Sequence, residues 1–308
     1  MIVSICIPAF KRPDFLKRLL DSICIQRFQD FEVIVTDDSP DQSVKKICQY
    51  YEDKISIFYY QNQPSLGTPE NWNEAVRRAK GKWIKIMHDD DWFKDENALY
   101  SFVKSVKLHP ESSFVFSAYK NISSSNYGKE VFISTTSFRY KMLLKNPATL
   151  FSRNIIGPPS CVMYKKEPGI DFDNRLKWLV DIDFYINYLS INKPVYINAN
   201  LINIGISDSQ VTNTTFRNKQ IEIPESFLLL EKYGTEILNN LLVFDAWWRL
   251  IRNLRIRNVE DIREAGYAGN IPKKILMIIR IQSKISVKYL SSPFISKSAM
   301  FIAFLTNG

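Results

Sequence analysis

Cysteines are scarce in this chain and form no recognisable pattern. The four of them, Cys6, Cys24, Cys48 and Cys161, lie far apart and include no CxxC pair. This spacing gives neither a zinc-ligand pattern nor a disulfide framework. We therefore expect buried thiols, in a protein of a reducing compartment.

Long apolar runs are absent as well. No stretch reaches the roughly 18 to 20 apolar residues that cross a bilayer, and the first ten residues, MIVSICIPAF, lack the basic start of a signal peptide. We expect a cytoplasmic protein whose N-terminus belongs to the fold. Its 308 residues, of which 45% are hydrophobic, can bury a substantial core in one large domain or in one domain with an appendage.

Acidic side chains are missing from the end of the chain. None follows Glu264, whereas basic residues continue among apolar segments such as ILMIIRI and AMFIAFL: Lys273, Lys274, Arg280, Lys284, Lys288 and Lys297. Such a segment resembles one that lies on an anionic membrane surface, although a helical cap on the core with a solvated basic face would give the same pattern. The net charge of +9 also raises a nucleic-acid role, against which the lack of an aromatic-basic motif argues.

Strand-like and helix-like segments alternate over about the first hundred residues. Strands are predicted at 2–8, 31–37, 55–60 and 82–87, with helices between them, and the pattern beyond residue 223 is mainly helical. Strands separated by helices at this spacing predict an α/β fold with a parallel sheet covered on both faces. In such a sheet, ligands bind beyond the carboxyl ends of the strands.

Acidic residues collect at those strand ends, in the turn TDDSPD and in HDDD. Adjacent carboxylates such as Asp89, Asp90 and Asp91 repel one another, so their clustering needs a positive partner. They suit a hard divalent cation, which would complete its shell with substrate phosphate oxygens and stabilise a departing diphosphate. The plainer alternative is a solvated acidic turn that caps the next helix; three acids directly after a buried strand argue against it.

Three motifs in one order resemble a known family. They are SICIPAFKRPDFLKRLLDSI, the segment QRFQDFEVIVTDDSPDQS, and GTPENWNEAVRRAKGKWIKIMHDDDWF. Together they resemble the nucleotide-sugar domain of family 2 glycosyltransferases of the bacterial polysaccharide type. The resemblance implies the GT-A fold, a Rossmann-like, mixed and mostly parallel sheet flanked by helices. It also implies a GT-A domain over 1–215, with a nucleotide-sugar half (1–120) and an acceptor half (121–215), followed by a helical region over 216–308.

The resemblance also implies a nucleotide site. Its residues would be Pro8, Ala9, Phe10, Arg12, Asp38, Asn73 and Asp89. Of these, Asp38 would accept the imide N–H of the base and Asp89 would face the ribose. Because a carboxylate only accepts hydrogen bonds, Asp38 suits uracil or thymine, so a UDP- or dTDP-sugar is favoured over a cytidine donor.

A metal site and a general base follow from the same resemblance. Asp90 and Asp91 would hold Mn²⁺ or Mg²⁺. His88, where the family often has an aspartate, is left out of the metal site and is expected to pack or to hydrogen-bond. Asp181 matches the family's general base, which takes the proton of the acceptor hydroxyl as that oxygen attacks the anomeric carbon with inversion. Asp183 points to another side of the helix, and we expect it to stabilise the helix N-terminus.

These expectations describe an inverting, metal-dependent glycosyltransferase of cell-surface polysaccharide synthesis. It would use a glycan or a lipid-linked saccharide as acceptor, with the C-terminal segment holding it at the inner face of the cell membrane. One alternative is a membrane-associated scaffold or binding protein with the same fold. Another is a sugar-nucleotide pyrophosphorylase, which would need a glycine-rich phosphate loop after the first strand; CIPAFKRPDF contains no glycine.

Overall fold

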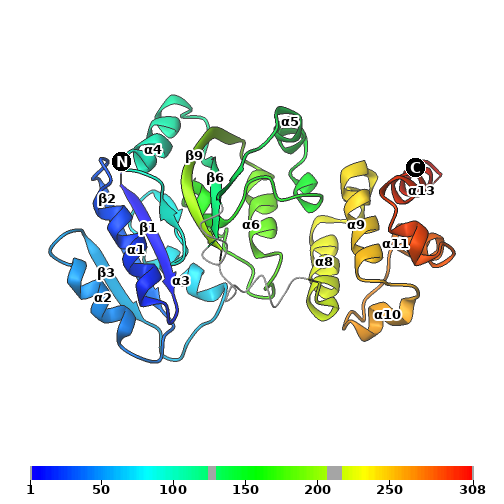
Figure 1. Ribbon diagram of the computed structural model, residues 1–308, viewed down its shortest axis with the longest axis horizontal. Helices are drawn as coiled ribbons and strands as arrows, with labels where there is room; N and C mark the ends of the chain where they lie inside the picture. The colour runs from blue at the N-terminus through cyan, green and yellow to red at the C-terminus, as the bar shows by residue number, and fades with distance from the viewer. Residues whose placement is uncertain (1, 124–129, 207–216, 307–308) are drawn as a thin grey trace. The chain divides into compact units, whose positions relative to one another are not determined.

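The computed structural model describes residues 2–123, 130–206 and 217–306 of the chain (Figure 1). By its internal contacts the chain divides into two compact units. The first consists of residues 1–145, 155–174 and 183–210, and the second of residues 146–154, 175–182 and 211–308. The domain boundary expected between residues 215 and 216 lies outside the described residues.

The described residues of the first unit contain a nine-stranded sheet. Its strands lie in the order β3-β2-β1-β4-β8-β6-β9-β5, with β7 paired to β6. Their bounds are Val3–Ala9 (β1), Phe31–Asp37 (β2), Ile57–Gln61 (β3), Trp83–Ile86 (β4), Trp92–Phe93 (β5), Phe114–Ser123 (β6), Glu130–Ile133 (β7), Val162–Lys165 (β8) and Pro194–Ile206 (β9). Strands β1 to β4 pair in parallel, whereas β8 runs antiparallel to β4 and β6. The expectation of a mixed, mostly parallel sheet flanked by helices is confirmed.

Helices cover both faces of the parallel part of the sheet. Their bounds are Pro13–Cys24 (α1), Ser43–Tyr51 (α2), Glu70–Arg78 (α3) and Ala98–Leu108 (α4); α5 (Ser137–Lys145) follows β7. Successive side chains of a strand point to opposite faces. Accordingly Ile5 and Ile7 join a core with α1, α2 and α4, whereas the thiol of Cys6 donates to the carbonyl of Ala75 in α3. Strand β1 is therefore buried along its whole length.

The carboxyl ends of β1, β2 and β4 meet at one edge of the sheet. Ala9 pairs with Asp37 across β1 and β2, and Cys6 pairs with Ile86, the last residue of β4. The segments that follow these strands leave the sheet at that edge. Residues 8–10, 37–38 and 88–91, which the sequence singles out, are thereby brought together by backbone pairing alone.

The second unit is built from helices in its described part. They are η1 (Pro147–Phe151), α8 (Lys219–Tyr233), η3 (Thr235–Asn239), α9 (Leu241–Asn253), α10 (Val259–Glu264), α11 (Lys273–Ser283), α12 (Val287–Leu290) and α13 (Pro293–Leu305). Their shared core includes Phe227, Trp247 and Trp248. The division between the units falls inside α6 (Val180–Leu189). No helix in the described ranges is both long enough and apolar enough to span a bilayer.

Candidate active site

Three consecutive carboxylates form a buried turn directly after β4. Asp89, Asp90 and Asp91 are only 4%, 8% and 2% exposed. Burial raises the pKa of Asp89 to about 7, against the opposing effect of Arg12. Burial and the charge of Asp90 also raise the pKa of Asp91 well above its usual value. A cation bound at this turn would favour the ionised form of Asp89 and Asp91.

Arg12 supplies one positive group to this turn from the segment between β1 and α1. Its Nη1 lies 2.9 Å from Asp90 Oδ2 and 3.6 Å from Asp89 Oδ1. The backbone N–H of Phe10 also donates to Asp89, while the Phe10 ring is exposed. The structure thus brings Phe10 and Arg12, two of the predicted nucleotide-site residues, into contact with the acidic turn.

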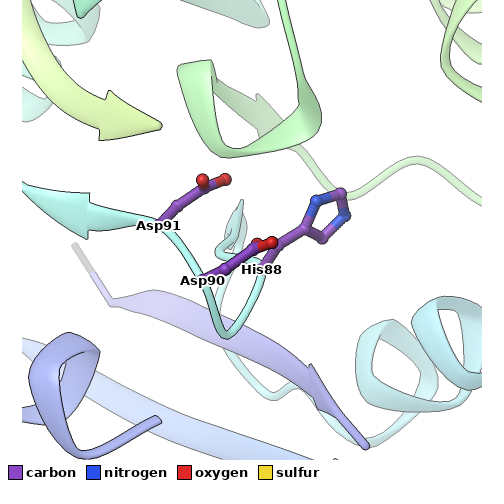
Figure 2. Close-up of side chains that lie close together, drawn as sticks. All are labelled: His88, Asp90 and Asp91. Carbon is purple, nitrogen blue, oxygen red and sulfur yellow. The ribbon is translucent and has the colours of Figure 1, made fainter. Parts of the chain in front are cut away.

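His88, Asp90 and Asp91 together provide a donor set for a cation (Figure 2). Each offers one ligand atom, and these atoms lie within 4.8 Å of one another. The His88 ring packs on Trp72 with centroids 4.7 Å apart, as the sequence leads one to expect, but its buried Nε2 has no hydrogen-bond partner. Burial lowers the pKa of His88 to about 4, so the ring is neutral near pH 7, the form that binds metals. The residues of the turn therefore fit a divalent cation.

Two residues from distant segments hold this turn, one through its backbone and one through a side chain. Arg18 of α1 donates from Nη2 to the carbonyl of Asp90 at 2.7 Å, and its guanidinium lies 3.7 Å from the centre of the Trp92 ring. On β9, the N–H of Gly205 donates to Asp91 Oδ1 at 3.2 Å. A Cβ at Gly205 would lie 2.4 Å from the carbonyl oxygen of Asp90, so only glycine permits this approach. The sequence patterns do not reveal either contact.

A buried lysine, Lys85, lies in β4, four residues before Asp89. Lys85 is fully buried, and its ammonium donates to the carbonyl of Ser160. Burial lowers the pKa of Lys85 to about 7, while the charge of Asp91 acts in the opposite direction. The hydroxyl of Ser160 accepts a hydrogen bond from the His88 N–H at 3.0 Å. Ser160 therefore links Lys85 to the start of the acidic turn.

Asp38 organises the loop after β3. Its Oδ1 accepts from Asn62 Nδ2 at 2.8 Å and from the N–H of Leu66 at 3.0 Å, and its Oδ2 accepts from the N–H of Gly67 at 2.8 Å. The Asp38 N–H donates to the carbonyl of Ala9 at 3.0 Å, next to the buried Pro8. A carboxylate has about four acceptor positions, so about one remains for a base N–H. The role of Asp38 in binding the base stays a prediction.

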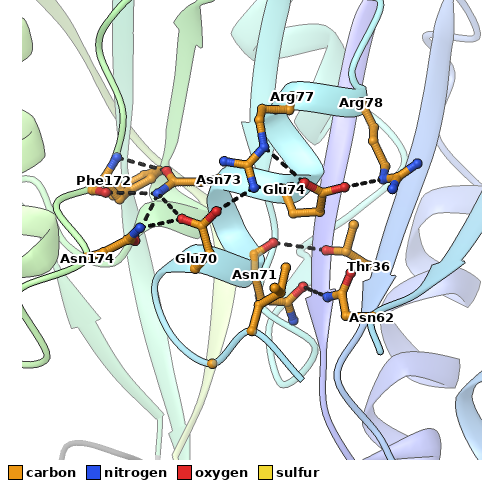
Figure 3. Close-up of polar contacts among 12 residues, drawn as sticks. Thr36, Asn62, Glu70, Asn71, Asn73, Glu74, Arg77, Arg78, Phe172 and Asn174 are labelled. Atoms are coloured by element: carbon orange, nitrogen blue, oxygen red, sulfur yellow. Dashed lines mark hydrogen bonds and ion pairs between the residues drawn. The ribbon is translucent and has the colours of Figure 1, made fainter. Parts of the chain in front are cut away.

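Asn73 and Asn71, two positions apart on α3, serve different neighbours (Figure 3). Asn73 Nδ2 donates to the carbonyl of Phe172 at 2.9 Å, with Asn174 Oδ1 and Glu70 Oε2 both at 3.2 Å, so these partners engage both amide hydrogens. Asn71 Oδ1 accepts from Asn62, the partner of Asp38, and its Nδ2 approaches the carbonyl of Ala9 at 3.4 Å. The nucleotide role of Asn73 stays a prediction, and Asn71 is the asparagine tied to Ala9 and to Asn62.

Asp181 lies in the second unit, in the first turn of α6. Its Oδ2 accepts from Asn154 Nδ2 at 2.8 Å and its Oδ1 from the N–H of Ile182 at 2.9 Å. Burial raises the pKa of Asp181 to about 6, although both hydrogen bonds oppose the rise. The side chain stays partly exposed, whereas Asp183 is fully buried. Asp181 is thus a half-buried residue whose carboxylate has a pKa of about 6.

Glu225 of α8 fixes the segment that leads into α6. Its Oε1 accepts from the N–H of Lys177 at 2.7 Å, and its Oε2 accepts from the N–H groups of Trp178 and Leu179, both at 2.9 Å. A carboxylate at a helix N-terminus satisfies free N–H groups and interacts favourably with the helix dipole. Glu225 therefore fixes the three residues that lead into α6, the helix that carries Asp181. It lies 44 residues from Asp181 in sequence, with no local motif to mark it.

A buried acidic turn at the carboxyl end of a mixed, mostly parallel sheet defines an α/β protein of the GT-A type. The chain belongs to glycosyl transferase family 2, whose model matches residues 4–168, so the resemblance of its motifs to that family is confirmed. An uncharacterised glycosyltransferase of Rickettsia typhi is 25% identical over 224 residues, which cover 69% of this chain and 66% of that protein. The poly(ribitol-phosphate) beta-glucosyltransferase of Bacillus spizizenii is 28% identical over 212 residues, which cover 65% of this chain and 31% of that protein.

Solved structures of glycosyltransferases share the fold. The TarS 1-349 fragment of S. aureus, in complex with UDP-GlcNAc, matches with a TM-score of 0.61 at 18% identity, over 99% of this chain and 90% of that one. The mannosyltransferase PcManGT from Pyrobaculum calidifontis, in complex with GDP-Man and Mn²⁺, matches with a TM-score of 0.57 at 16% identity, over 99% of this chain and 86% of that one. At these identities the likeness establishes the fold alone.

Proposed function

We propose that this chain is an inverting, metal-dependent glycosyltransferase that transfers a sugar from a UDP- or dTDP-sugar. The acceptor is a glycan or a lipid-linked saccharide of a cell-surface polysaccharide, and the protein works at the inner face of the cell membrane. The observation that carries the proposal is the buried turn of Asp89, Asp90 and Asp91 at the carboxyl ends of β1, β2 and β4, where the unpartnered nitrogen of His88 completes a cation site.

The donor is held by residues of the first unit. The exposed ring of Phe10 stacks on the base, and the remaining acceptor position of Asp38 takes the base N–H. Asp89, already bonded to the Phe10 N–H, faces the ribose. Asp90 and Asp91 would hold a divalent ion, which when bound would neutralise the charge that develops on the diphosphate. Arg12, whose Nη1 lies 2.9 Å from Asp90 Oδ2, would be placed to pair with the diphosphate of a donor bound beside this turn.

Proton removal from the acceptor is assigned to Asp181. A general base works best when its pKa lies near the operating pH, and burial places the pKa of Asp181 at about 6. Asn154 orients the carboxylate through Oδ2. The complete burial of Asp183 leaves it without access to an acceptor, which supports the choice of Asp181.

A thermal-shift panel of UDP-, dTDP- and GDP-sugars, each with and without Mn²⁺, tests the proposal. A ligand at about one hundred times its Kd raises the free energy of unfolding by about 2.7 kcal/mol, so a uracil or thymine donor with Mn²⁺ should raise Tm clearly. Asp90→Ala should abolish the part of this rise in Tm that depends on Mn²⁺. Asp53→Ala, at an exposed position of the same unit, should leave that part unchanged. Preference for the GDP-sugar would contradict the choice of a uracil or thymine donor. The absence of any shift, together with no hydrolysis of any donor, would overturn the proposal in favour of a scaffold.

A further inference from the structure

A strongly basic pocket of about 530 Å³ lies within the second unit, outside the residues assigned to catalysis. Its lining combines residues of α9, α12 and α13 with the loop after α9. Among the described residues, the charged ones that line it are Arg217, Arg249, Arg252, Arg255, Arg257 and Lys297, with Asp245 as the one carboxylate. We call this cavity the basic pocket. Six cationic side chains against one anionic side chain make it a site for a negatively charged ligand.

Hydrogen bonds to neutral groups hold some of these cations in place. The lone carboxylate, Asp245, already pairs with Arg249 at 2.9 Å. Arg252 Nη1 donates to Ser296 Oγ at 3.0 Å, and Arg257 Nη1 donates to the carbonyl of Ile285 at 3.1 Å. Burial, with the nearby charge of Arg249, lowers the pKa of Arg252. Arg252 and Arg257 are thus positioned by neutral partners, which do not offset their charge, and a bound anion would do so.

Helix α13 borders the basic pocket and exposes an apolar face. Phe294, Phe301, Ile302 and Leu305 are 81%, 47%, 62% and 63% exposed. Their spacing of seven, eight and eleven residues places them on one side of the helix. The opposite side, with Ser296, Met300 and Ala303, is buried. We call the exposed side the outer face of α13.

The basic pocket and the outer face of α13 are adjacent parts of one surface. Pro293 and Lys297 belong to α13 and also line the pocket. Val287 of α12, another lining residue, is exposed as well, and so is Tyr289 two residues further on. A cationic site edged by exposed aromatic and aliphatic side chains matches the composition of segments that lie in a membrane interface.

We propose that the basic pocket binds the phosphate headgroup of an anionic membrane lipid while the outer face of α13 enters the apolar region of the same leaflet. This inference rests on the proposed function, in which the protein works at the inner face of the cell membrane. It adds the site by which the protein would attach there. A soluble polyanion would satisfy the pocket but leave the outer face in water. Only a lipid accounts for the charged and the apolar parts together.

Flotation of the full chain with vesicles tests the inference. One set contains phosphatidylcholine alone and the other contains one part phosphatidylglycerol to two parts phosphatidylcholine. We expect binding to the anionic set, falling with added salt. The exposed pair of substitutions Arg255→Glu and Lys297→Glu should lower the partition coefficient by roughly fivefold or more for each basic side chain removed. Phe294→Gln with Phe301→Gln should lower it further, because the apolar anchor is lost.

Matched substitutions in the first unit serve as controls. Lys46→Glu and Ile191→Gln change an exposed lysine and an exposed isoleucine of that unit and should leave vesicle binding unchanged. Each variant is also tested for the donor-dependent rise in Tm, which needs no lipid. Vesicle binding without any donor shift would contradict the proposed function and leave this inference standing.

Three results would overturn the inference. They are equal binding to neutral and anionic vesicles, full binding by the Arg255 and Lys297 double variant, and a chain that ignores vesicles but binds soluble inorganic polyphosphate through the pocket. The last outcome would instead identify the basic pocket as a polyanion site.

Discussion

Asp181 combines partial exposure with a raised pKa, and this combination gives a direct prediction for catalysis. Asp181→Asn should lower kcat by roughly 10² to 10⁴, the usual contribution of a general base, with the donor-dependent rise in Tm unchanged. Because the base must be ionised, kcat/KM of the native chain should rise with pH through about 6, the pKa of Asp181. Steady-state kinetics across this pH range provide both measurements.

Asn154 offers a control that leaves the carboxylate in place. Its hydrogen bond lowers the pKa of Asp181, so Asn154→Ala should move the acidic limb of the pH profile to higher pH. Full activity in Asp181→Asn, or an unchanged limb in Asn154→Ala, would assign the base to another residue.

His88 leads to a prediction about metal affinity. His88→Phe keeps an aromatic ring against Trp72 but removes the unpartnered nitrogen beside Asp90. Since even the outer partners of metal ligands change affinity by roughly 10- to 100-fold, we expect Mn²⁺ to bind about tenfold more weakly or worse. Titration of free Mn²⁺ by electron paramagnetic resonance measures this without turnover. Trp72→Phe, which changes the packing and keeps His88, should retain the native affinity. Equal affinity in His88→Phe would mean that the ring only packs.

The sequence predicts where a residue lies when its place follows from the strand pattern alone. Acids at the ends of parallel strands must share an edge, so the placement of Asp38 beside Ala9 and of Asp89 beside Phe10 follows from the strand pattern. The partners of these residues do not follow. Asp38 binds a loop and Asn73 binds Phe172, and both sets of contacts depend on how distant segments pack.

At the scale of elements, β9 lies so close to the acidic turn that a side chain at Gly205 would displace one of the two. Gly205→Ala would place a Cβ 2.4 Å from the carbonyl oxygen of Asp90, so either the strand or the turn must shift. We expect a lower Tm and also weaker Mn²⁺-dependent donor binding, both measurable by thermal shift.

Gly81→Ala provides the matched control for Gly205→Ala. Its Cβ would lie 2.6 Å from Ser4 Oγ and 2.8 Å from Ser4 N, at the opposite end of β1 from the acidic turn. It should lower Tm without weakening donor affinity. Loss of affinity in both variants would mean that instability alone, and not the position of the turn, explains the effect.

Elements were predictable where the chain repeats a simple unit. The four parallel strands and the helices between them follow from hydrophobic periodicity, and β3, observed at Ile57–Gln61, is within two residues of its predicted bounds. Strand β9 was not predicted, because its NANLINIGI stretch shows neither strict alternation nor a uniform apolar run. Its parallel pairing with β6 is a long-range choice that local patterns do not encode.

For the whole molecule, the two units are interleaved along the chain. Residues 146–154 and 175–182 belong to the second unit although they precede residue 215. Ala148 lies in the same core as Trp247, and Arg249 Nη2 donates to the carbonyl of Ser152 at 2.7 Å. The segment that carries Asp181 is likewise tied to Glu225. The expected GT-A domain over 1–215 therefore contains segments whose packing partners come after it.

A chain that ends at residue 215 tests what this interleaving means for catalysis. It keeps the acidic turn with Arg12 and Arg18, so it should still bind Mn²⁺ and donor. It loses Glu225 and Arg249, so the segment that holds Asp181 should lose its anchoring, and sugar transfer should fall far more than donor affinity does. Glu225→Ala in the full chain, which frees three N–H groups before α6, should reproduce the loss of transfer in a milder form, whereas Glu231→Ala, further along α8, should not. Transfer at the native rate by the shortened chain would show that residues 1–215 form a complete catalytic domain and that the C-terminal helices serve only attachment.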